Sequence, residues 1–154
     1  MKCRHCGTPL NHTFLDLGFA PPSNAYLTKE DLSRPETWYP LKTKVCHNCW
    51  LVQTEDYADA ATLFTQDYAY FSSTSAGWLD HARRYSETMI DELALGSQSH
   101  VIEVAANDGY LLRNFVAAGI PCMGIEPTAS TAAAAEHQGI PVLREFFGEA
   151  PGKR

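Results

Sequence analysis

Four of the five cysteines form two pairs whose spacing is that of metal ligands. Cys3 and Cys6 make one Cys-x-x-Cys pair, and Cys46 and Cys49 make the other. Two thiolates on one tight turn can reach the same ion, and two such turns supply the four tetrahedral ligands of a structural Zn²⁺ site. Gly7, directly after the first pair, suits the left-handed turn that closes such a knuckle. These residues predict a structural zinc ion whose closed shell has no open position for water.

Other interpretations of the cysteines remain open. The pairs lie about 40 residues apart, whereas a common zinc ribbon spaces them by roughly 15–20, although a long loop need not disturb two preformed turns. They could instead be unrelated buried thiols, or one pair could be a redox dithiol, which needs a strand–helix context. Cys122 lies in an apolar run and is expected to be a small buried side chain.

A second candidate site is the stretch EVAANDG, residues 103–109. It lies where a nucleotide-binding loop would lie, between an apolar run and a helical pattern, yet it lacks the usual glycines. Aligned with the Gly-x-Gly-x-Gly turn of a class I methyltransferase, Ala105, Asn107 and Gly109 take the glycine positions. Alanine is small, asparagine accepts a positive φ readily, and Gly109 suits close packing or ligand approach. Asp108 is a candidate N-cap for the following helix.

Two acidic residues accompany this loop. Glu103 precedes the turn, where methyltransferases commonly carry an acid that faces the amino-acid portion of the cofactor. Glu126 ends the next predicted strand, about 20 residues further on, where a carboxylate can accept hydrogen bonds from both ribose hydroxyls. S-adenosylmethionine (SAM) fits better than NAD because it has no pyrophosphate. A loop with few glycines and a neighbouring acid therefore does not weaken its binding. The alternative is an ordinary strand-to-helix turn that binds nothing.

The elements that must position this loop alternate regularly after residue 100. The predicted strands and helices, in chain order, are 100–105, helix 109–118, 121–126, helix 129–138 and 141–144, with Gly119 and Gly139 closing the helices. Short strands alternating with such helices predict a parallel sheet with right-handed crossovers. Ahead of them, apolar residues at three- and four-residue spacing predict an amphipathic helix over 76–95, with Thr74 or Ser75 as N-cap and Gly96 as its stop.

The N-terminal part has a different pattern. Residues 39–45 alternate between apolar and polar and predict a strand that runs into Cys46, with residues 51–53 returning as its hairpin partner. The stretch FAPPSN, residues 19–24, is expected to be a loop because consecutive prolines remove donors. The fold class is therefore α/β: a small zinc-ribbon-like domain over 1–67, then the first half of a Rossmann-like class I methyltransferase domain over 68–154.

Composition excludes several classes of protein. The formal charge of −6 argues against a reader of the nucleic-acid backbone, which needs a basic face. No apolar run approaches the roughly 18 residues of a membrane span, and the N-terminus does not have the pattern of a signal peptide. We therefore expect a cytoplasmic protein that binds neither nucleic acid nor a membrane, where cysteines serve metals more often than disulfides.

Several stretches together resemble one family, the zinc-containing SAM-dependent C-methyltransferases that act on nucleotide-linked deoxysugars in antibiotic sugar biosynthesis. They are CRHCG, LDLGFAPPSNAYL, YPLKTKVCHNCWLVQ, DYAYFSSTS, EVAANDGYLL and GIEPTAS, which span nearly the whole chain in the family's order. The resemblance implies a zinc-binding domain, a central Rossmann-like SAM domain and a C-terminal domain that helps to enclose the nucleotide-sugar substrate.

The resemblance also implies roles for individual residues. Zinc would be held by Cys3, Cys6, Cys46 and Cys49. The methionine end of SAM would be lined by Glu103, Ala105, Asn107 and Gly109, and its ribose held by Glu126. Phe71 and Ser72 would contact the cofactor, and the Tyr70 hydroxyl would orient a substrate or share a proton. The alternative for this stretch is an aromatic cluster that packs the long helix onto the zinc domain.

The catalytic base is the main departure from the family. Methyl transfer to carbon needs a base that removes the adjacent proton. The family's histidine-containing stretch for this task follows the next strand, a position beyond Arg154, and none of the six histidines matches its context. We expect a fragment or truncated product that is inactive by itself, with an exposed sheet edge that promotes self-association. The alternative function is a non-catalytic zinc-binding interaction module.

Overall fold

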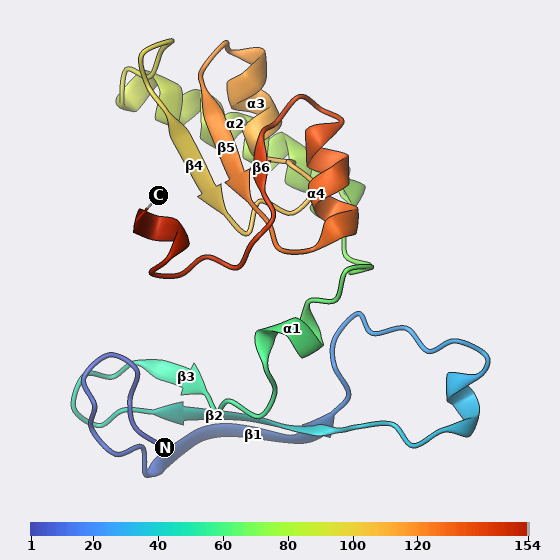
Figure 1. Cartoon of the computed structure of the whole chain (residues 1–154). Helices are drawn as coiled ribbons and strands as arrows, with labels where there is room; N and C mark the ends of the chain where they lie inside the picture. Colours follow the sequence, from blue (N-terminus) through green and yellow to red (C-terminus); the bar gives the residue numbers. More distant parts are fainter. Residues whose placement is uncertain (154) are drawn as a thin grey trace. The chain divides into compact units, whose positions relative to one another are not determined.

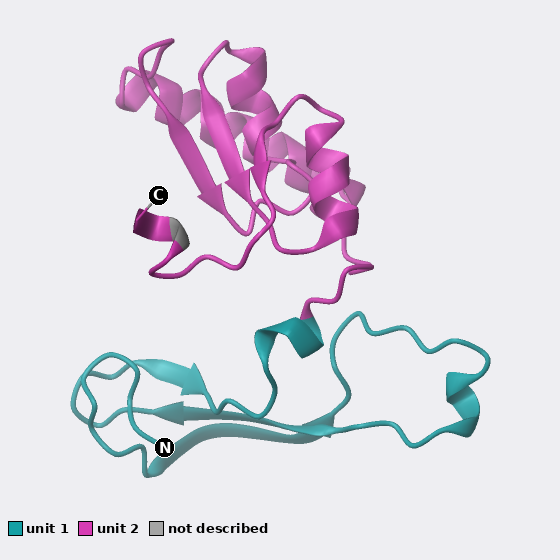
Figure 2. Cartoon of the chain, in the orientation of Figure 1, with its two compact units in different colours: residues 1–63 teal, residues 64–154 magenta. Residues whose placement is uncertain are grey.

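The computed structural model describes residues 1–153 and divides the chain into two compact units, Met1–Leu63 and Phe64–Arg154 (Figure 2). The expected division was between residues 67 and 68. The structure places it between residues 63 and 64, so residues 64–67 belong to the second unit. The first unit contains an antiparallel sheet and the second a parallel sheet with helices (Figure 1). The predicted α/β fold class is confirmed.

The first unit is a three-stranded antiparallel sheet in the order β1-β2-β3. Its strands are β1 (His12–Ala20), β2 (Tyr39–Val45) and β3 (Val52–Thr54), with a short η1 (Asp31–Ser33) and α1 (Ala60–Leu63). The predicted hairpin of β2 and β3 is confirmed, since Val45 pairs with Val52.

The long strand β1 was not predicted. Its pairing with β2 is irregular between Thr13 and Leu15 and again between Asp16 and Phe19, and Gly18 has a φ of +79°. The signal in the sequence was the alternation of Leu15, Leu17 and Phe19 with Asp16 and Gly18, a period of two that each bulge shifts by one position. The expectation that Phe19 begins a loop is wrong, because β1 continues to Ala20.

The second unit is a three-stranded parallel sheet in the order β4-β5-β6. The strands are β4 (Val101–Val104), β5 (Cys122–Ile125) and β6 (Val142–Leu143), and the crossovers contain α3 (Leu112–Ala117) and α4 (Ala129–Glu136). The predicted parallel arrangement is confirmed. A buried apolar cluster that includes Leu112, Phe115 and Ile140 fills the space between strands and helices.

The long amphipathic helix is α2 (Ala76–Glu92), which follows a short η2 (Ser72–Thr74). Ser75 is its N-cap, because its side chain accepts a hydrogen bond from the Trp78 N–H at 3.3 Å. The predicted stop at Gly96 is wrong. The helix ends at Glu92, and the left-handed position after it is taken by Ala94, with a φ of +48°.

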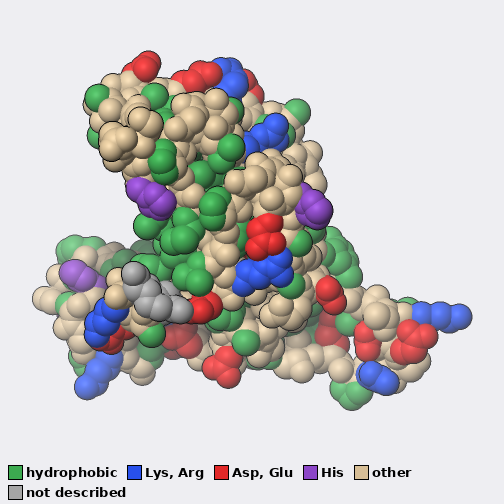
Figure 3. Space-filling view, turned by 45° about the horizontal axis from the view of Figure 1, so that its top comes forward, with side chains coloured by type: hydrophobic (Ala, Val, Ile, Leu, Met, Phe, Trp, Pro, Cys, Tyr) green, Lys and Arg blue, Asp and Glu red, His purple; other side chains and the backbone are tan. Residues whose placement is uncertain are grey.

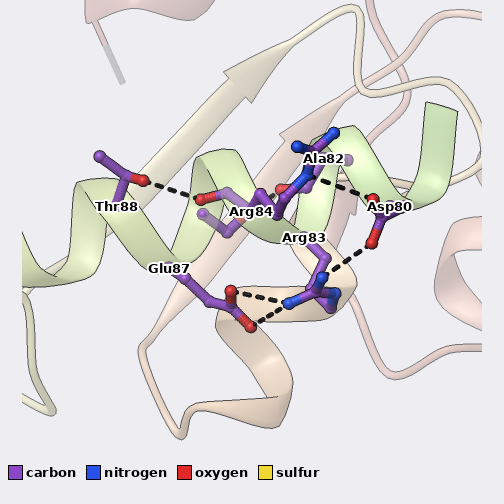
Figure 4. Close-up of polar contacts among 7 residues, drawn as sticks. Asp80, Ala82, Arg83, Arg84, Glu87 and Thr88 are labelled. Atoms are coloured by element: carbon purple, nitrogen blue, oxygen red, sulfur yellow. Dashed lines mark hydrogen bonds and ion pairs between the residues drawn. The ribbon is translucent and has the colours of Figure 1, made fainter. Parts of the chain in front are cut away.

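The outer side of α2 is charged. Arg83 bridges Asp80 and Glu87, at 2.7 Å to each, and Arg84 also reaches Asp80 at 3.2 Å (Figure 4). All four side chains are about half exposed, so these pairs add little stability. The opposite side buries Ala82.

The face of β4 away from its neighbouring helix is open to solvent. Ile102 is 55% exposed and Val104 50% exposed, while α2 and α3 lie together behind the sheet (Figure 1). Hydrophobic side chains are visible among the surface atoms in the space-filling view (Figure 3). No helix among residues 1–153 combines the length and apolar character that a membrane crossing requires.

Candidate functional site

The two Cys-x-x-Cys turns have the same backbone geometry. In the first, the Gly7 N–H donates to the Cys3 carbonyl at 2.9 Å, and in the second the Trp50 N–H donates to the Cys46 carbonyl at 2.9 Å. Gly7 and Trp50 both have a positive φ, +73° and +64°. The left-handed turn expected at Gly7 is therefore present, and the second knuckle forms it without a glycine.

The four sulfur atoms form one cluster. The Sγ atoms of Cys3 and Cys49 are 3.6 Å apart, those of Cys6 and Cys46 are 3.5 Å apart, and all four lie within 4.8 Å of one another. Tetrahedral zinc with bonds of about 2.3 Å places its sulfurs about 3.8 Å apart, whereas a disulfide requires about 2.05 Å. The cluster predicted from the sequence is confirmed, and its geometry is consistent with one structural zinc ion.

Gln53, on β3, supports the cluster from behind. Its Nε2 donates to Cys3 Sγ at 3.3 Å, its Oε1 accepts from the Arg4 backbone N–H at 3.0 Å, and it is only 5% exposed. A donor to a ligating sulfur fixes the orientation of that ligand and tunes the metal site. Gln53 was expected only as a hairpin residue, since neither its type nor its spacing identifies a contact to sulfur.

Hydrogen bonds in the first knuckle, which carries Cys3 and Cys6, favour the thiolate form that zinc needs. The hydroxyl and the backbone N–H of Thr8 lower the pKa of Cys6 to about 5. The backbone N–H of Cys6, followed by the side chain of Gln53, lowers the pKa of Cys3. At Cys49 the Leu51 backbone N–H lowers the pKa, but burial and the neighbouring sulfurs outweigh it and raise the pKa to about 12. Because a thiolate is the zinc ligand, the hydrogen bonds ease deprotonation at Cys3 and Cys6, and Cys49 depends on the metal charge to lose its proton.

In the second unit the EVAANDG loop has an alternating backbone. Ala105, Asn107 and Gly109 have φ values of +59°, +50° and +78°. These are the three positions aligned with glycines, so the left-handed conformation is kept although only one glycine remains. Asn107 takes the positive φ expected of it. Ala105, expected only to be small, takes one too, which is uncommon for a residue with a Cβ.

Gly109 is required by packing. A Cβ at this position would lie 2.4 Å from Ile140 Cδ1 and 3.1 Å from Ala135 Cβ, which are buried core residues. Of the two reasons considered for this glycine, close packing is the one that the geometry supports. The start of the helical segment after the loop can therefore approach α4 closely.

Glu126 ties the loop to the end of β5. Its Oε2 accepts from the Asn107 N–H at 2.9 Å, and its Oε1 accepts from the Thr128 N–H at 3.0 Å and the Thr128 hydroxyl at 2.6 Å. The residue is 5% exposed. An ionised carboxylate offers about four lone-pair positions, so these three bonds leave about one for a ligand.

Side chains of the loop also hold the segment before α2. Asn107 Oδ1 accepts from the Ser72 N–H at 2.9 Å, and Asn107 Nδ2 donates to the Tyr70 carbonyl at 3.0 Å. Asp108 Oδ2 accepts from the Ser73 N–H at 3.1 Å. The prediction that Asp108 caps the helix after the loop is wrong, because α3 has no side-chain cap and the carboxylate is used by Ser73.

Two buried carboxylate oxygens have no hydrogen-bond partner within residues 1–153, Oε2 of Glu103 and Oδ1 of Asp108. Burial, followed by the charges of Asp108 and Glu126, raises the pKa of Glu103 to about 8. A buried acceptor without a donor costs free energy. A ligand that brings a positive charge or a donor would remove that cost.

A cavity of about 430 Å³ opens beside the loop. Its lining contains the carboxylates Glu126 and Glu145, and no Lys or Arg is found among the described residues that line it. Aromatic and apolar side chains make up most of the remainder. They are Phe64, Tyr68, Tyr70, Val104, Tyr110, Ile125, Pro127, Phe146 and Phe147.

The structure brings most of the expected site residues to this cavity. Those that line it are Tyr70, Ser72, Ala105, Asn107 and Glu126. Phe71, Glu103 and Gly109 are outside its lining. Tyr110 and Thr128 were not considered from the sequence. Tyr110 directly follows Gly109, and Thr128 follows Glu126 by two positions, so proximity to the predicted residues was the only available signal.

The fold and the two sites define a module with a four-cysteine cluster consistent with zinc, followed by an α/β unit of the Rossmann type. Residues 3–64 match the protein family described as "Putative zinc binding domain". The chain is 27% identical over 146 residues to the C-methyltransferase NovU of Streptomyces niveus. The aligned region covers 95% of this chain and 34% of that protein. The resemblance to a C-methyltransferase is confirmed, and the chain spans about a third of the length of the curated relative that it matches.

Proposed function

We propose that this chain is the zinc-binding and cofactor-binding part of a SAM-dependent C-methyltransferase. The observation that carries the proposal is the acidic lining of the cavity beside the loop, which contains Glu126 and Glu145 and no Lys or Arg among its described residues. SAM carries an ammonium and a sulfonium, so its positive charges would complement these carboxylates and the buried acids Glu103 and Asp108 of the loop. The similarity to a protein named as a C-methyltransferase supports a cofactor that donates a methyl group.

The loop is poorly suited to a diphosphate. Phosphate-binding loops leave backbone N–H groups free to face the anion, whereas here four of them are used within the chain. The N–H groups of Ala105 and Ala106 donate to the Ile125 carbonyl, that of Asn107 to Glu126, and that of Gly109 to the Ala106 carbonyl. With acids nearby and no Lys or Arg among the described residues that line the cavity, SAM fits this site better than NAD.

Glu126 would accept a hydrogen bond from one ribose hydroxyl and not from both. Its remaining lone-pair position would accept from one hydroxyl, while its other bonds hold Asn107 and Thr128. Loss of SAM affinity in Glu126→Ala would therefore combine a lost ribose contact with a loosened loop. Binding of 5′-methylthioadenosine and of its 2′- and 3′-deoxy analogues would show which hydroxyl the carboxylate takes.

When bound, SAM would supply the electrophilic methyl group, and the chain would orient it. Aromatic side chains of the cavity would exclude water from the adenosine portion. We propose a nucleotide-linked deoxysugar as the acceptor, and the Tyr70 hydroxyl, at the cavity wall, would position it or share its proton. The zinc ion would stabilise the first unit. The zinc-bound thiolates suit a reducing compartment, so the cytoplasm is the proposed location.

Calorimetry on the 154-residue protein tests the cofactor assignment directly. SAM should bind with one site per chain, and NAD should not bind at the same concentration. Lack of SAM binding at millimolar concentration would contradict the proposal. Zinc retained in that case would favour the alternative, a zinc-binding interaction module without a cofactor, whose self-association would then be measured by light scattering.

A further inference from the structure

The segment before α2 is held against the cavity by hydrogen bonds at both ends. Residues 64–73, called the strap below, supply Phe64, Tyr68, Tyr70 and Ser72 to the cavity lining. At its C-terminal end the strap is bonded to the side chains of Asn107 and Asp108.

The N-terminal end of the strap is held by α4. The Ser130 N–H donates to the Gln66 carbonyl at 3.1 Å, and the Ser130 hydroxyl donates to the Tyr68 carbonyl at 3.0 Å. Along the strap, the alternate residues Tyr68, Tyr70 and Ser72 line the cavity. The strap is therefore an extended wall of the site, fixed by two elements that follow consecutive strands.

Asn107 contributes to this arrangement in a way that glycine could not. Its amide accepts from the Ser72 N–H and donates to the Tyr70 carbonyl, which is how a neighbouring strand would bond two alternate residues. Its positive φ is the conformation that a glycine would also adopt. The backbone of a glycine loop is thus kept, and a side chain with both a donor and an acceptor is added to it.

We propose that Asn107 is a positioning residue that latches the strap to the cofactor loop, and that this latch sets both ligand affinity and the placement of Tyr70. The latch itself rests on the observed contacts, while the identity of the ligand rests on the proposed function. Asp108 strengthens the same attachment through Ser73. Since the Glu126 carboxylate holds the backbone of Asn107, one continuous set of bonds runs from β5 through the loop to the strap.

Amide hydrogen exchange measured by NMR on the zinc-loaded 154-residue protein tests the latch without any ligand. In Asn107→Gly the backbone can keep its φ, so we expect the Ser72 amide to exchange at least tenfold faster. The Gly124 amide, bonded to the Pro141 carbonyl within the sheet, should change much less. Asn107→Asp keeps the acceptor for Ser72 but replaces the donor to the Tyr70 carbonyl with an oxygen that repels it, so Ser72 should be less protected than in wild type. Equal protection of Ser72 in wild type and Asn107→Gly would overturn the proposal.

The Asp variant keeps the test decisive if Asn107→Gly does not fold. Protection of Ser72 equal to wild type in a folded Asn107→Asp would overturn the two-bond latch, because that variant lacks the donor to Tyr70. Ser130→Ala loosens the other end and leaves the loop unchanged, so the Tyr68–Tyr70 region should exchange faster there while Ser72 stays protected. Loss of Ser72 protection in that variant would mean that the strap unfolds as a whole and that Asn107 is not a separate latch.

Calorimetry with SAM tests the consequence for binding. Asn107→Gly should weaken SAM about tenfold, the equivalent of about 1.4 kcal/mol, and Ser130→Ala should weaken it less. Unchanged affinity together with fast Ser72 exchange would overturn the role of the latch in binding. Absence of SAM binding to the wild type would overturn the proposed function and this consequence, and the exchange data would still decide whether Asn107 holds the strap.

Discussion

The Glu126 carboxylate accepts a hydrogen bond from the Asn107 backbone N–H at 2.9 Å, which joins the end of β5 to the middle of the loop after β4. A carboxylate at this strand end would ordinarily be assigned to a ligand. Here it is first a structural acceptor, and most of its hydrogen-bonding capacity is used by the chain.

Glu126→Ala should destabilise the second unit by about 2–4 kcal/mol, because it leaves buried donors of Asn107 and Thr128 without an acceptor. Urea unfolding, followed on resonances of β4 and β5, measures the change. Glu136→Ala is the matched control, since Glu136 pairs with Arg144 at the surface and should cost less than about 1 kcal/mol. Similar losses in both variants would contradict the assignment.

Gly109→Ala should cost about 3 kcal/mol or more, since the new Cβ would clash with Ile140 and the φ is +78°. Gly119→Ala separates the two effects. Its φ is +70° but nothing lies within 4 Å of the added Cβ, so only the backbone cost of about 1–2 kcal/mol remains. Thermal unfolding of the two variants should rank them in this order, and the opposite order would exclude packing as the reason for Gly109.

Trp50→Gly should stabilise the first unit or leave its stability unchanged. The indole is 73% exposed while its backbone is left-handed, so glycine would remove about 1–2 kcal/mol of strain, partly offset by its greater freedom when unfolded. Trp50→Ala keeps the strain and is the control. Zinc affinity, measured by competition with a chelator, should follow the same direction. Marked destabilisation by glycine alone would indicate a stabilising role for the indole.

Zinc content depends on the two knuckles together. The double variant Cys46→Ser and Cys49→Ser should lose its metal and unfold the first unit, because binding free energy is folding free energy in such modules. Metal analysis should give about one Zn per chain for wild type and for the control Cys122→Ser, which alters the buried core of the other unit. Stoichiometric zinc in the double variant would refute the four-cysteine site.

The raised pKa of Glu103 predicts a pH dependence of stability. Its ordinary value is 4.5 and its folded value is about 8, so between these pH values the unfolded chain has released the proton that the folded chain keeps. The unfolded state then binds fewer protons, and the free energy of unfolding of the second unit should fall as pH rises through this window. Glu103→Gln should remove this contribution, as measured by urea unfolding at pH 5.5, 7 and 8.5. If the free energy of unfolding of Glu103→Gln fell with pH as steeply as that of wild type, the raised pKa of Glu103 would be contradicted.

The sequence was sufficient where the signal is local. The cysteine pairs, the parallel strands and the positive φ of Asn107 follow from residue types and spacing, because turns and crossovers are short-range structures. The left-handed Ala105 was not anticipated, since alanine has no preference for that conformation. Its geometry is imposed by the hydrogen bonds that the loop makes with the end of β5.

Contacts between distant residues were not predictable. The bond from Gln53 to Cys3 joins positions 50 residues apart, and nothing in the sequence near either one indicates it. Asp108 has the residue type of a helix cap, yet it is used by Ser73 from a segment 35 residues earlier. In both cases the side chain could bond to several partners, and the tertiary structure determines which one lies within reach.

The connection between β1 and β2 has its two ends fixed by pairing of Ala20 with Tyr39. Residues 21–38 lie between them, outside the sulfur cluster and its supporting hydrogen bonds. Doubling the length of a flexible loop costs only about 0.6 kcal/mol of chain entropy. Insertions in this connection should therefore leave the metal affinity nearly unchanged, so this part of the first unit is open to variation in length during evolution.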